Sequence, residues 1–386
     1  MNIVITGLGA VSACGLNLKE TIENFSLGIR KAGKVTLFKT DLLYPVFEAK
    51  GFIPENNKCM RTLSLAFCAI KEAIVEANLA DFSGMRLGIC LGTTVASQLN
   101  DIDFYKAYRK NGRAPTQSAK RFLESNLAQA VKDYFHINTK FCSTVVNACS
   151  SGTDAIGLGA SWLRSDYCDI VIAGGADELN RVPLDGFGSL GVVSNSLCAP
   201  FDRDRSGLNL GEGSGIVILE KEDIARKRGR KPDLFLKGYG LAADGYHLTA
   251  PHPEGRGLER ALDFAMRQAG AKVDQVAFIN AHGTATKDND KVEGKVFRKV
   301  FGEKIKFVST KGFTGHTLGA AGGLEAVFVC LSLRFGWIPK SAGFITLDEQ
   351  IGIAPVNKKT DINARFAIST SLAFGGNNSA LVIARN

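Results

Sequence analysis

The sequence predicts an α/β protein built from two similar halves. Short β-branched and apolar runs, such as Ile3–Thr6 and Phe141–Asn147, alternate with longer segments of helical periodicity. Each half opens with a strand that enters a glycine turn (NIVITGLG and LFLKGYG) and closes with a strand (SGIVILE and SALVIAR). This order predicts two β-α-β units whose sheets and central helices pack together. We expect the halves to cover residues 1–230 and 231–386, divided just before the strand Leu234–Gly238.

The composition indicates a well-packed protein of a reducing compartment. The chain has 386 residues, of which 45% are hydrophobic, and its 42 glycines against 10 prolines indicate tight turns rather than disordered linkers. Its nine cysteines are odd in number and include no C-x-x-C pair, so we expect neither a disulfide framework nor a zinc site. No run reaches the roughly 20 apolar residues of a membrane span. We expect a cytoplasmic protein without membrane association.

A formal net charge of +9 predicts an acidic partner. Positive charge is densest in residues 106–121 and 225–231. Neither segment lies on a recognisable nucleic-acid-binding module, so nucleic acid is not the expected partner. The alternative is a solvated basic face without a specific use.

The first half begins with a strand followed by Gly-Leu-Gly-Ala-Val-Ser at residues 7–12. This nearly matches the dinucleotide fingerprint G-x-G-x-x-G, but Ser12 replaces the third glycine and no acidic residue follows a second strand. A dinucleotide-binding oxidoreductase is therefore only a minor alternative. An amphipathic helix is expected over Arg61–Ala77, a strand over Arg86–Leu91, and a basic excursion from the core over residues 100–124.

The segment Phe141–Arg164 predicts a buried strand that turns sharply into a buried helix, with Cys149 in the turn. A helix N-terminus favours negative charge, so a cysteine there has a reason to be a thiolate nucleophile. Apart from Asp154 and the final Arg164, the residues of this helix are nearly all small or apolar. The alternative is that Cys149 is a buried free cysteine that acts as a small hydrophobe.

Two histidines lie in glycine-rich turns that follow strands, His282 in NAHGTAT and His316 in TGHTLG. Strand ends are where α/β proteins build their sites, although each histidine alone fits a structural role equally well. Neither has the spacing of a zinc ligand, so no metal is expected. Lys311 and Glu325 flank the second turn. Glu325 needs a partner such as Lys311 or a histidine if its apolar helix is buried, and needs none if it lies at an exposed edge.

Near the C-terminus, Ser371–Asn378 predicts a strand end that enters a di-glycine loop. Such a loop allows the backbone to approach a reacting carbonyl and donate an N–H group. An ordinary turn is the alternative.

Together these motifs resemble those of the β-ketoacyl-(acyl carrier protein) synthases, condensing enzymes of the thiolase superfamily, and in particular the elongating, synthase II-like type. The resemblance covers essentially the whole chain, in order and spacing. It rests on VITGLGAVS, NACSSG, VIAGGAD, PFDRDRSGLNLGEGSG, NAHGTATKDND, STKGFTGHTLGAAGGLEA and LAFGGNNSALV.

The resemblance implies a thiolase-like fold with duplicated βαβαβαββ halves in a five-layered α-β-α-β-α arrangement. It also implies a catalytic set with Cys149 as the acyl-accepting nucleophile. Its expected members and neighbours are the Cys149-His282-His316 triad, the supporting pair Lys311 and Glu325, the pantetheine contacts Thr284 and Thr286, and Phe374 with Gly375 at the gate beside the oxyanion hole.

The activity implied is that of an acyltransferase. It would condense malonyl carrier, with loss of carbon dioxide, with an acyl group held on Cys149, and so extend the chain by two carbons in fatty acid or type II polyketide and aryl polyene synthesis. No bound cofactor is expected, since the phosphopantetheine of an acidic acyl carrier protein carries the substrates. We expect a homodimer or a heterodimer with a related subunit, and a carrier-docking surface among Lys106, Arg109, Lys110, Arg113, Lys120 and Arg121.

The chain departs from the common pattern at AFGGNN, where GFGGTN is usual. With GLNLGEG, this looks more like synthases of dedicated type II pathways than of primary fatty acid synthesis. Thiolase itself is a rival, but it uses a second cysteine as base where this chain has His316. A catalytically silent partner subunit is the other rival, and Cys149 argues against a chain-length factor, which lacks the nucleophile.

Overall fold

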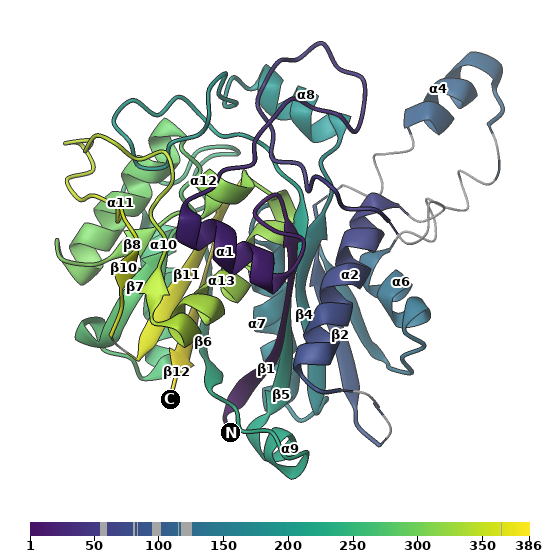
Figure 1. Cartoon of the computed structure of the whole chain (residues 1–386), viewed down its shortest axis with the longest axis vertical. Helices are drawn as coiled ribbons and strands as arrows, with labels where there is room; N and C mark the ends of the chain where they lie inside the picture. Colours follow the sequence, from purple (N-terminus) through teal and green to yellow (C-terminus); the bar gives the residue numbers. More distant parts are fainter. Residues whose placement is uncertain are drawn as a thin grey trace.

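The computed structural model describes residues 1–54, 60–79, 82, 84–94, 102–114, 116, 126–363 and 365–386 (Figure 1). Strands of the first half are β1 (Ile3–Ser12), β2 (Leu87–Gly92), β3 (Phe141–Val145), β4 (Ile170–Asp177) and β5 (Gly213–Lys221). Those of the second half are β6 (Leu234–Ala243), β7 (Val276–Asn280), β8 (Phe307–Val308), β11 (Phe366–Ala373) and β12 (Asn377–Arg385). They form one sheet in the order β3-β2-β4-β5-β1-β6-β12-β11-β7-β8. The five strands of the first half therefore lie on one side of the β1–β6 junction, and the five of the second half lie on the other.

The junction between the two halves of the sheet is short. Strand β1 pairs with β6 only through Ile3, Val4 and Ile5, whereas its pairing with β5 continues to Ser12 past an irregularity at Gly7. Beyond Ile5 the two halves of the sheet therefore separate, and helices occupy the space between them.

The helices complete five layers. Helices α7 (Ser151–Arg164) and α13 (Ala321–Phe335) lie in the middle and contact strands of both halves (Figure 1). The outer face of the first half is covered by α2 (Arg61–Glu76) and α6 (Leu127–Tyr134), and that of the second by α10 (Arg256–Ala269) and α11 (Lys287–Phe301). One apolar cluster surrounds the two central helices and reaches both halves of the sheet, and a separate cluster lies under the outer helices of each half. The expected α-β-α-β-α arrangement is confirmed.

The remaining elements lie around this framework. They are α1 (Leu18–Leu27), α4 (Ile102–Asn111), α8 (Arg181–Ser189), α9 (Glu222–Lys227), α12 (Lys311–Thr314), the 3-10 turns η1 (Val273–Gln275) and η2 (Leu318–Ala320), and the small hairpin β9 (Trp337–Ile338) and β10 (Thr360–Asp361). Helix α4 projects from the body, as expected for the basic excursion (Figure 1).

The first strand is longer than the sequence indicates. Residues 7–12, expected as a turn resembling a dinucleotide fingerprint, belong to β1, are buried and pair with β5. Glycine is required at positions 7 and 9 because α2 lies directly against them. An added Cβ would stand 2.1 Å from the carbonyl oxygen of Ala73 at Gly7 and 1.9 Å from that of Ala69 at Gly9. A buried strand cannot receive a pyrophosphate on a helix N-terminus, so the oxidoreductase alternative loses its motif.

The basic segment 225–231 is partly structural. Arg228 donates to the carboxylate of Glu220 and to two backbone carbonyls, and Arg230 donates to the carbonyls of Thr6 and Glu76. These two arginines therefore hold the first half together and are not free to bind an external acid.

Helix α13 is the apolar centre of the molecule. The stretch Leu318–Phe335 is long and apolar enough to cross a membrane, with mean hydropathy 1.5, but 89% of it is buried inside the protein. It packs against α7 at glycine positions, where an added Cβ on Gly152 would stand 2.8 Å from the backbone nitrogen of Gly323. The two central helices thus approach almost to backbone contact.

Substituting Gly323 tests this close packing. A Cβ at Gly323 would lie 2.3 Å from the carbonyl oxygen of Gly215, so Gly323→Ala forces α13 away from β5. We expect its free energy of unfolding to fall by about 1–3 kcal/mol, as for other overpacked cores, in urea titrations followed by circular dichroism.

The matched control is Gly186→Ala on α8, where an added Cβ meets nothing within 4 Å. This change should leave stability unchanged or raise it by up to about 1 kcal/mol through helix propensity. Equal unfolding midpoints for the two variants would contradict the packing argument.

Candidate active site

The turn before α7 presents Cys149 to the interior. After β3 the backbone reverses through Ala148, whose φ of 47° is in the left-handed region. This strained turn sets Cys149 immediately ahead of Ser150, the N-cap of α7, and leaves the cysteine only 5% exposed. The sharp strand-to-helix turn predicted from the sequence is present, but the expectation of a buried strand is wrong, because β3 is an edge strand whose residues are only partly buried.

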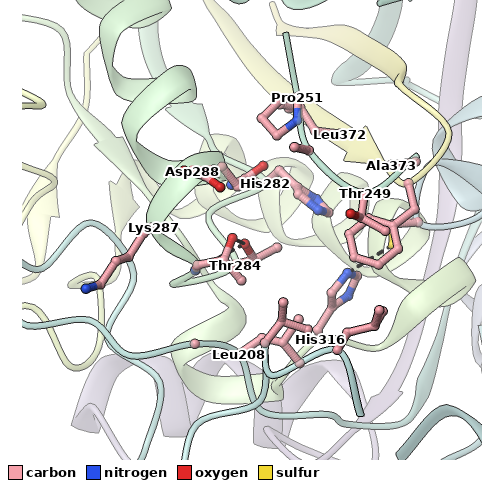
Figure 2. A pocket seen from close by; sticks show the side chains of 18 of the residues that line it. Leu208, Thr249, Pro251, His282, Thr284, Lys287, Asp288, His316, Leu372 and Ala373 are labelled. Carbon is pink, nitrogen blue, oxygen red and sulfur yellow. Dashed lines mark hydrogen bonds between the residues drawn. The ribbon is translucent and has the colours of Figure 1, made fainter. Parts of the chain in front are cut away.

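Both histidines converge on this cysteine. His282 follows β7, and His316 lies between α12 and η2. Nε2 of His316 is 3.1 Å from Sγ of Cys149, and the two imidazole rings are 5.2 Å apart, nearly perpendicular. In Figure 2 the two rings extend into the same space from different segments.

Hydrogen bonds at Nδ1 fix the tautomer of both rings. The backbone N–H of Leu318 donates to Nδ1 of His316 at 3.2 Å, and the ammonium of Lys311 lies 3.2 Å from Nδ1 of His282. Because each Nδ1 accepts, each neutral ring carries its proton on Nε2. Burial and the charge of Lys311 hold the pKa of both histidines well below the usual range, so both stay neutral. The site therefore offers two Nε2–H donors.

Lys311 and Glu325 form a buried ion pair beside the histidines. Each side chain is only 3% exposed. Burial raises the pKa of Glu325 to about 7, although Lys311 opposes the rise. The second carboxylate oxygen of Glu325 has no hydrogen-bond partner within the described part of the chain. The sequence left open whether Glu325 is buried, and the structure answers that it is.

The cysteine differs from the expected thiolate. Burial raises the pKa of Cys149 to about 11, and the opposing effects of Lys311 and of the backbone N–H of Phe374 are smaller. Loss of water around the sulfur thus outweighs the helix N-terminus. Cys149 is a neutral thiol at rest and must lose its proton as it reacts.

The three side chains also have the spacing of a metal site. Their donor atoms all lie within 4.8 Å of one another. A divalent cation there would, however, be repelled by the buried ammonium of Lys311, which lies beside His282. The absence of a metal remains a prediction.

A cavity of about 380 Å³ leads to Cys149. Thr284 and Thr286 line it, and their hydroxyl groups are 2.8 Å apart. Figure 2 shows Thr284 between the histidines and Lys287, which points away from them. Phe374 also lines the cavity and packs on Phe187, with ring centroids 5.5 Å apart. The cavity is thus polar along one wall and aromatic near the cysteine.

The charged motif PFDRDRSG supports this wall from behind. Arg205 is buried, pairs with Asp348 at 2.6 Å, and donates to the backbone carbonyls of Thr286 and Lys287. Gly375 does not line the cavity, but it donates its N–H to the carbonyl of Leu248 at 2.8 Å and so fixes the loop after Phe374.

Two buried carboxylates of the site were missed in the sequence. Glu293 accepts hydrogen bonds from the backbone N–H groups of His282 and Gly283, and Asp177 accepts one from Gly319. Burial raises their pKa values to about 7 and about 6. Glu293 could have been found, because it lies on the apolar stripe of α11 with Val292 and Val296. Phe187, on the exposed helix α8, gave no such signal.

Family profiles match nearly the whole chain. The N-terminal domain of β-ketoacyl synthases matches residues 1–225, and the C-terminal domain matches residues 235–344. The chain belongs to the β-ketoacyl synthase family. Cys149, His282 and His316, which are expected to form its triad, lie together in the interior, and their assignment as the triad stays a prediction.

Relatives of this synthase cover its full length. It is 32% identical to 3-oxoacyl-[acyl-carrier-protein] synthase 2 of Staphylococcus aureus (strain N315), over 98% of this chain and 97% of the relative. The ishigamide ketosynthase/chain length factor has a similar structure, with a TM-score of 0.94, 29% identity, and coverage of 100% and 99%. So does the type II polyketide ketosynthase AntDE, solved with its acyl carrier protein AntF and a bound hexaketide, with a TM-score of 0.91, 25% identity and the same coverage.

The raised pKa of Cys149 predicts a steep alkylation profile. Because only the thiolate reacts, alkylation of Cys149 by iodoacetamide should rise about tenfold per pH unit up to about pH 10. The double variant Lys311→Met/Glu325→Gln removes both charges of the buried pair, so neither is left unpaired. Loss of the ammonium should raise the pKa of Cys149 further and slow its alkylation at each pH. Intact-mass measurements would follow the rate.

Lys227→Met, on the exposed end of α9, is the control and should keep the wild-type profile. A wild-type alkylation rate that levels off below about pH 9 would show that burial does not determine the pKa of Cys149.

Proposed function

We propose that this synthase elongates acyl chains by decarboxylative condensation of a malonyl carrier with an acyl group held on Cys149, in the cytoplasm. The observation that carries the proposal is the buried contact between Sγ of Cys149 and Nε2 of His316. With His282 alongside, this contact joins a nucleophile to two neutral hydrogen-bond donors at the inner end of a cavity.

In the first step Cys149 takes the acyl group. Its sulfur attacks the thioester carbonyl of an acyl phosphopantetheine, the new C–S bond forms, and the bond to the pantetheine sulfur breaks. The thiol proton passes to the departing pantetheine thiolate, so the protons balance. Backbone N–H groups of Cys149 and Phe374 hold the developing oxyanion, and each such donor is worth about 10² to 10³ in rate.

In the second step a malonyl group loses carbon dioxide. The electrons of the broken C–C bond form an enolate, and the Nε2–H groups of His282 and His316 stabilise its oxygen. The enolate carbon attacks the acyl-cysteine, a C–C bond forms, and Cys149 leaves as a thiolate that takes a proton from water. Burial lowers the pKa of His282, and the charge of Lys311 lowers it further, so this ring keeps its role as a neutral donor.

The cavity supports a phosphopantetheine arm as the substrate carrier. Thr284 and Thr286 would contact the amides of the arm, and Phe374 with Gly375 would form the gate near the cysteine. The acidic carrier protein itself would bind basic side chains outside the cavity. Among the expected residues, Lys106, Arg109 and Lys110 lie on α4, and Arg113 follows it. Lys120 and Arg121 lie outside the described residues.

Strand β3 supports assembly with a second subunit. It is one of the two edge strands of the sheet, its five residues are each only partly buried, and the adjoining Val146 is 63% exposed. An edge strand favours pairing with another chain. We expect a homodimer through β3, or a heterodimer of the kind named in the ishigamide ketosynthase/chain length factor structure.

Intact-mass analysis tests the chemistry. Wild type incubated with acyl-carrier thioesters of several lengths should gain one acyl group, and added malonyl carrier should discharge it as a β-ketoacyl carrier. Cys149→Ala should gain none. His282→Ala should still be acylated but should discharge at least about 10²-fold more slowly, because the enolate loses a donor. The lengths accepted would separate primary fatty acid synthesis from a polyene or polyketide pathway.

Native mass spectrometry of the same samples would give the subunit composition. Failure of the wild-type homodimer to accept any acyl group would favour the alternative, a silent or heterodimeric partner subunit that needs a second chain for activity.

Charge reversal on α4 tests carrier docking. Lys106→Glu, Arg109→Glu and Lys110→Glu together should raise the KM for the acyl carrier several-fold at low salt and leave kcat nearly unchanged, since the carrier is acidic and docks away from the chemistry. The control set Lys227→Glu, Lys231→Glu and Lys272→Glu makes the same charge change at other exposed lysines. An unchanged KM in the α4 variant would remove α4 from the docking surface.

A further inference from the structure

The proposed oxyanion hole is assembled from two distant segments. One donor, the N–H of Cys149, follows the left-handed Ala148, and the other, the N–H of Phe374, precedes Gly375 and Gly376 with φ of 87° and 83°. Each N–H direction depends on an unusual turn. A contact between the two segments must therefore set the distance and angle between the donors.

A chain of side-chain hydrogen bonds makes this contact. Nδ2 of Asn377, directly after the di-glycine loop, donates to Oδ1 of Asn147 at 2.5 Å. Nδ2 of Asn147, two residues before the nucleophile, donates in turn to Oδ2 of Asp154 at 2.5 Å. Asp154 lies on the first turn of α7 and is 6% exposed.

The carboxylate of Asp154 decides which way the amide of Asn147 faces. An ionised carboxylate only accepts hydrogen bonds, so Asn147 must turn its NH₂ group toward Asp154 and its oxygen toward Asn377. With the opposite orientation, two oxygens would face each other at one end and two NH₂ groups at the other. The carboxylate of Asp154 thus sets the donor-to-acceptor direction of the hydrogen bonds from Asn377 through Asn147.

The same carboxylate joins the two halves of the protein. Oδ2 accepts from Asn147 and from the hydroxyl of Ser150 at 2.8 Å, both in the nucleophile turn. Oδ1 accepts from the hydroxyl of Tyr239 on β6 at 3.0 Å and from that of Ser379 on β12. All four donors are neutral side chains. The carboxylate is therefore stabilised by hydrogen bonds and by the N-terminus of α7 rather than by any of these four side chains as a cation.

We propose that Asp154 is a positioning residue for the oxyanion hole, which it aligns by orienting Asn147 toward Asn377. The inference rests on the proposed function, because it concerns the acyl-transfer step. It also gives a reason for the asparagine at position 377, where the sequence departs from the common GFGGTN pattern: its amide reaches the amide of Asn147.

Two reactions of the same sulfur test the proposal. Transfer from an acyl carrier passes through an oxyanion, whereas alkylation by iodoacetamide does not. Asp154→Asn and Asn377→Ala should lower the maximum rate of single-turnover acylation by about 10- to 100-fold, the cost expected when a donor is misplaced. The half-saturating carrier concentration and the alkylation rate should each stay within about twofold of wild type.

A swapped pair adds a rescue. In Asn147→Asp/Asp154→Asn, the carboxylate at position 147 can accept from Asn377 and from the amide at position 154, so acylation should recover at least about fivefold relative to Asp154→Asn. Ser161→Ala, which removes one hydrogen bond from the same helix, is the control and should match wild type.

Equal losses in acylation and alkylation would overturn the proposal, because they would indicate a general effect on the thiol or the fold. So would unchanged acylation in Asn377→Ala, or a swapped pair with the wild-type unfolding temperature and no recovery. Because Asn377 is only partly buried, its variant should fold even if Asp154→Asn does not. Wild type that is not acylated would instead contradict the proposed function itself.

Discussion

The near contact between the backbones of α7 and α13 is the constraint on which the rest of the structure depends. Glycines at their crossing let each helix bring its N-terminal turn to the same point, Cys149 from one half and His316 from the other. The two parts of the sheet must then diverge after Ile5 to make room for both helices. One steric condition, the absence of side chains at a helix crossing, therefore determines the layering of the fold and the location of its chemistry.

The same burial explains the electrostatics of the site. With little water nearby, the thiol and both imidazoles are held neutral, and charge is kept on the Lys311–Glu325 pair behind them. A site of this kind does not store a thiolate for use. It provides fixed N–H donors at the positions where negative charge appears during the reaction, which costs no reorganisation when charge develops.

Much of this arrangement was predictable, for a physical reason. Strand-to-helix turns with small residues are local, so the turns with Cys149 and His282 could be predicted from neighbouring residues, and the family resemblance implied that they meet. Whether Glu325 is buried could not be read, since it depends on strands far along the chain. The glycines of β1 were misinterpreted as a turn because the helix that requires them, α2, begins more than fifty residues later. The expectation of a thiolate at Cys149 was also wrong, because the pKa of the thiol reflects desolvation by the whole fold.

The late position of α13 in the sequence affects how the first half of the chain folds during synthesis. This helix is made late in synthesis, yet it covers the inner faces of β4 and β5 and the side of α7. While the ribosome is still making residues before 321, the first half lacks the helix that covers this surface in the folded protein. Such exposed surface attracts chaperones and other nascent chains. The close packing that creates the active site thus ties completion of the first half to the emergence of the last third of the polypeptide.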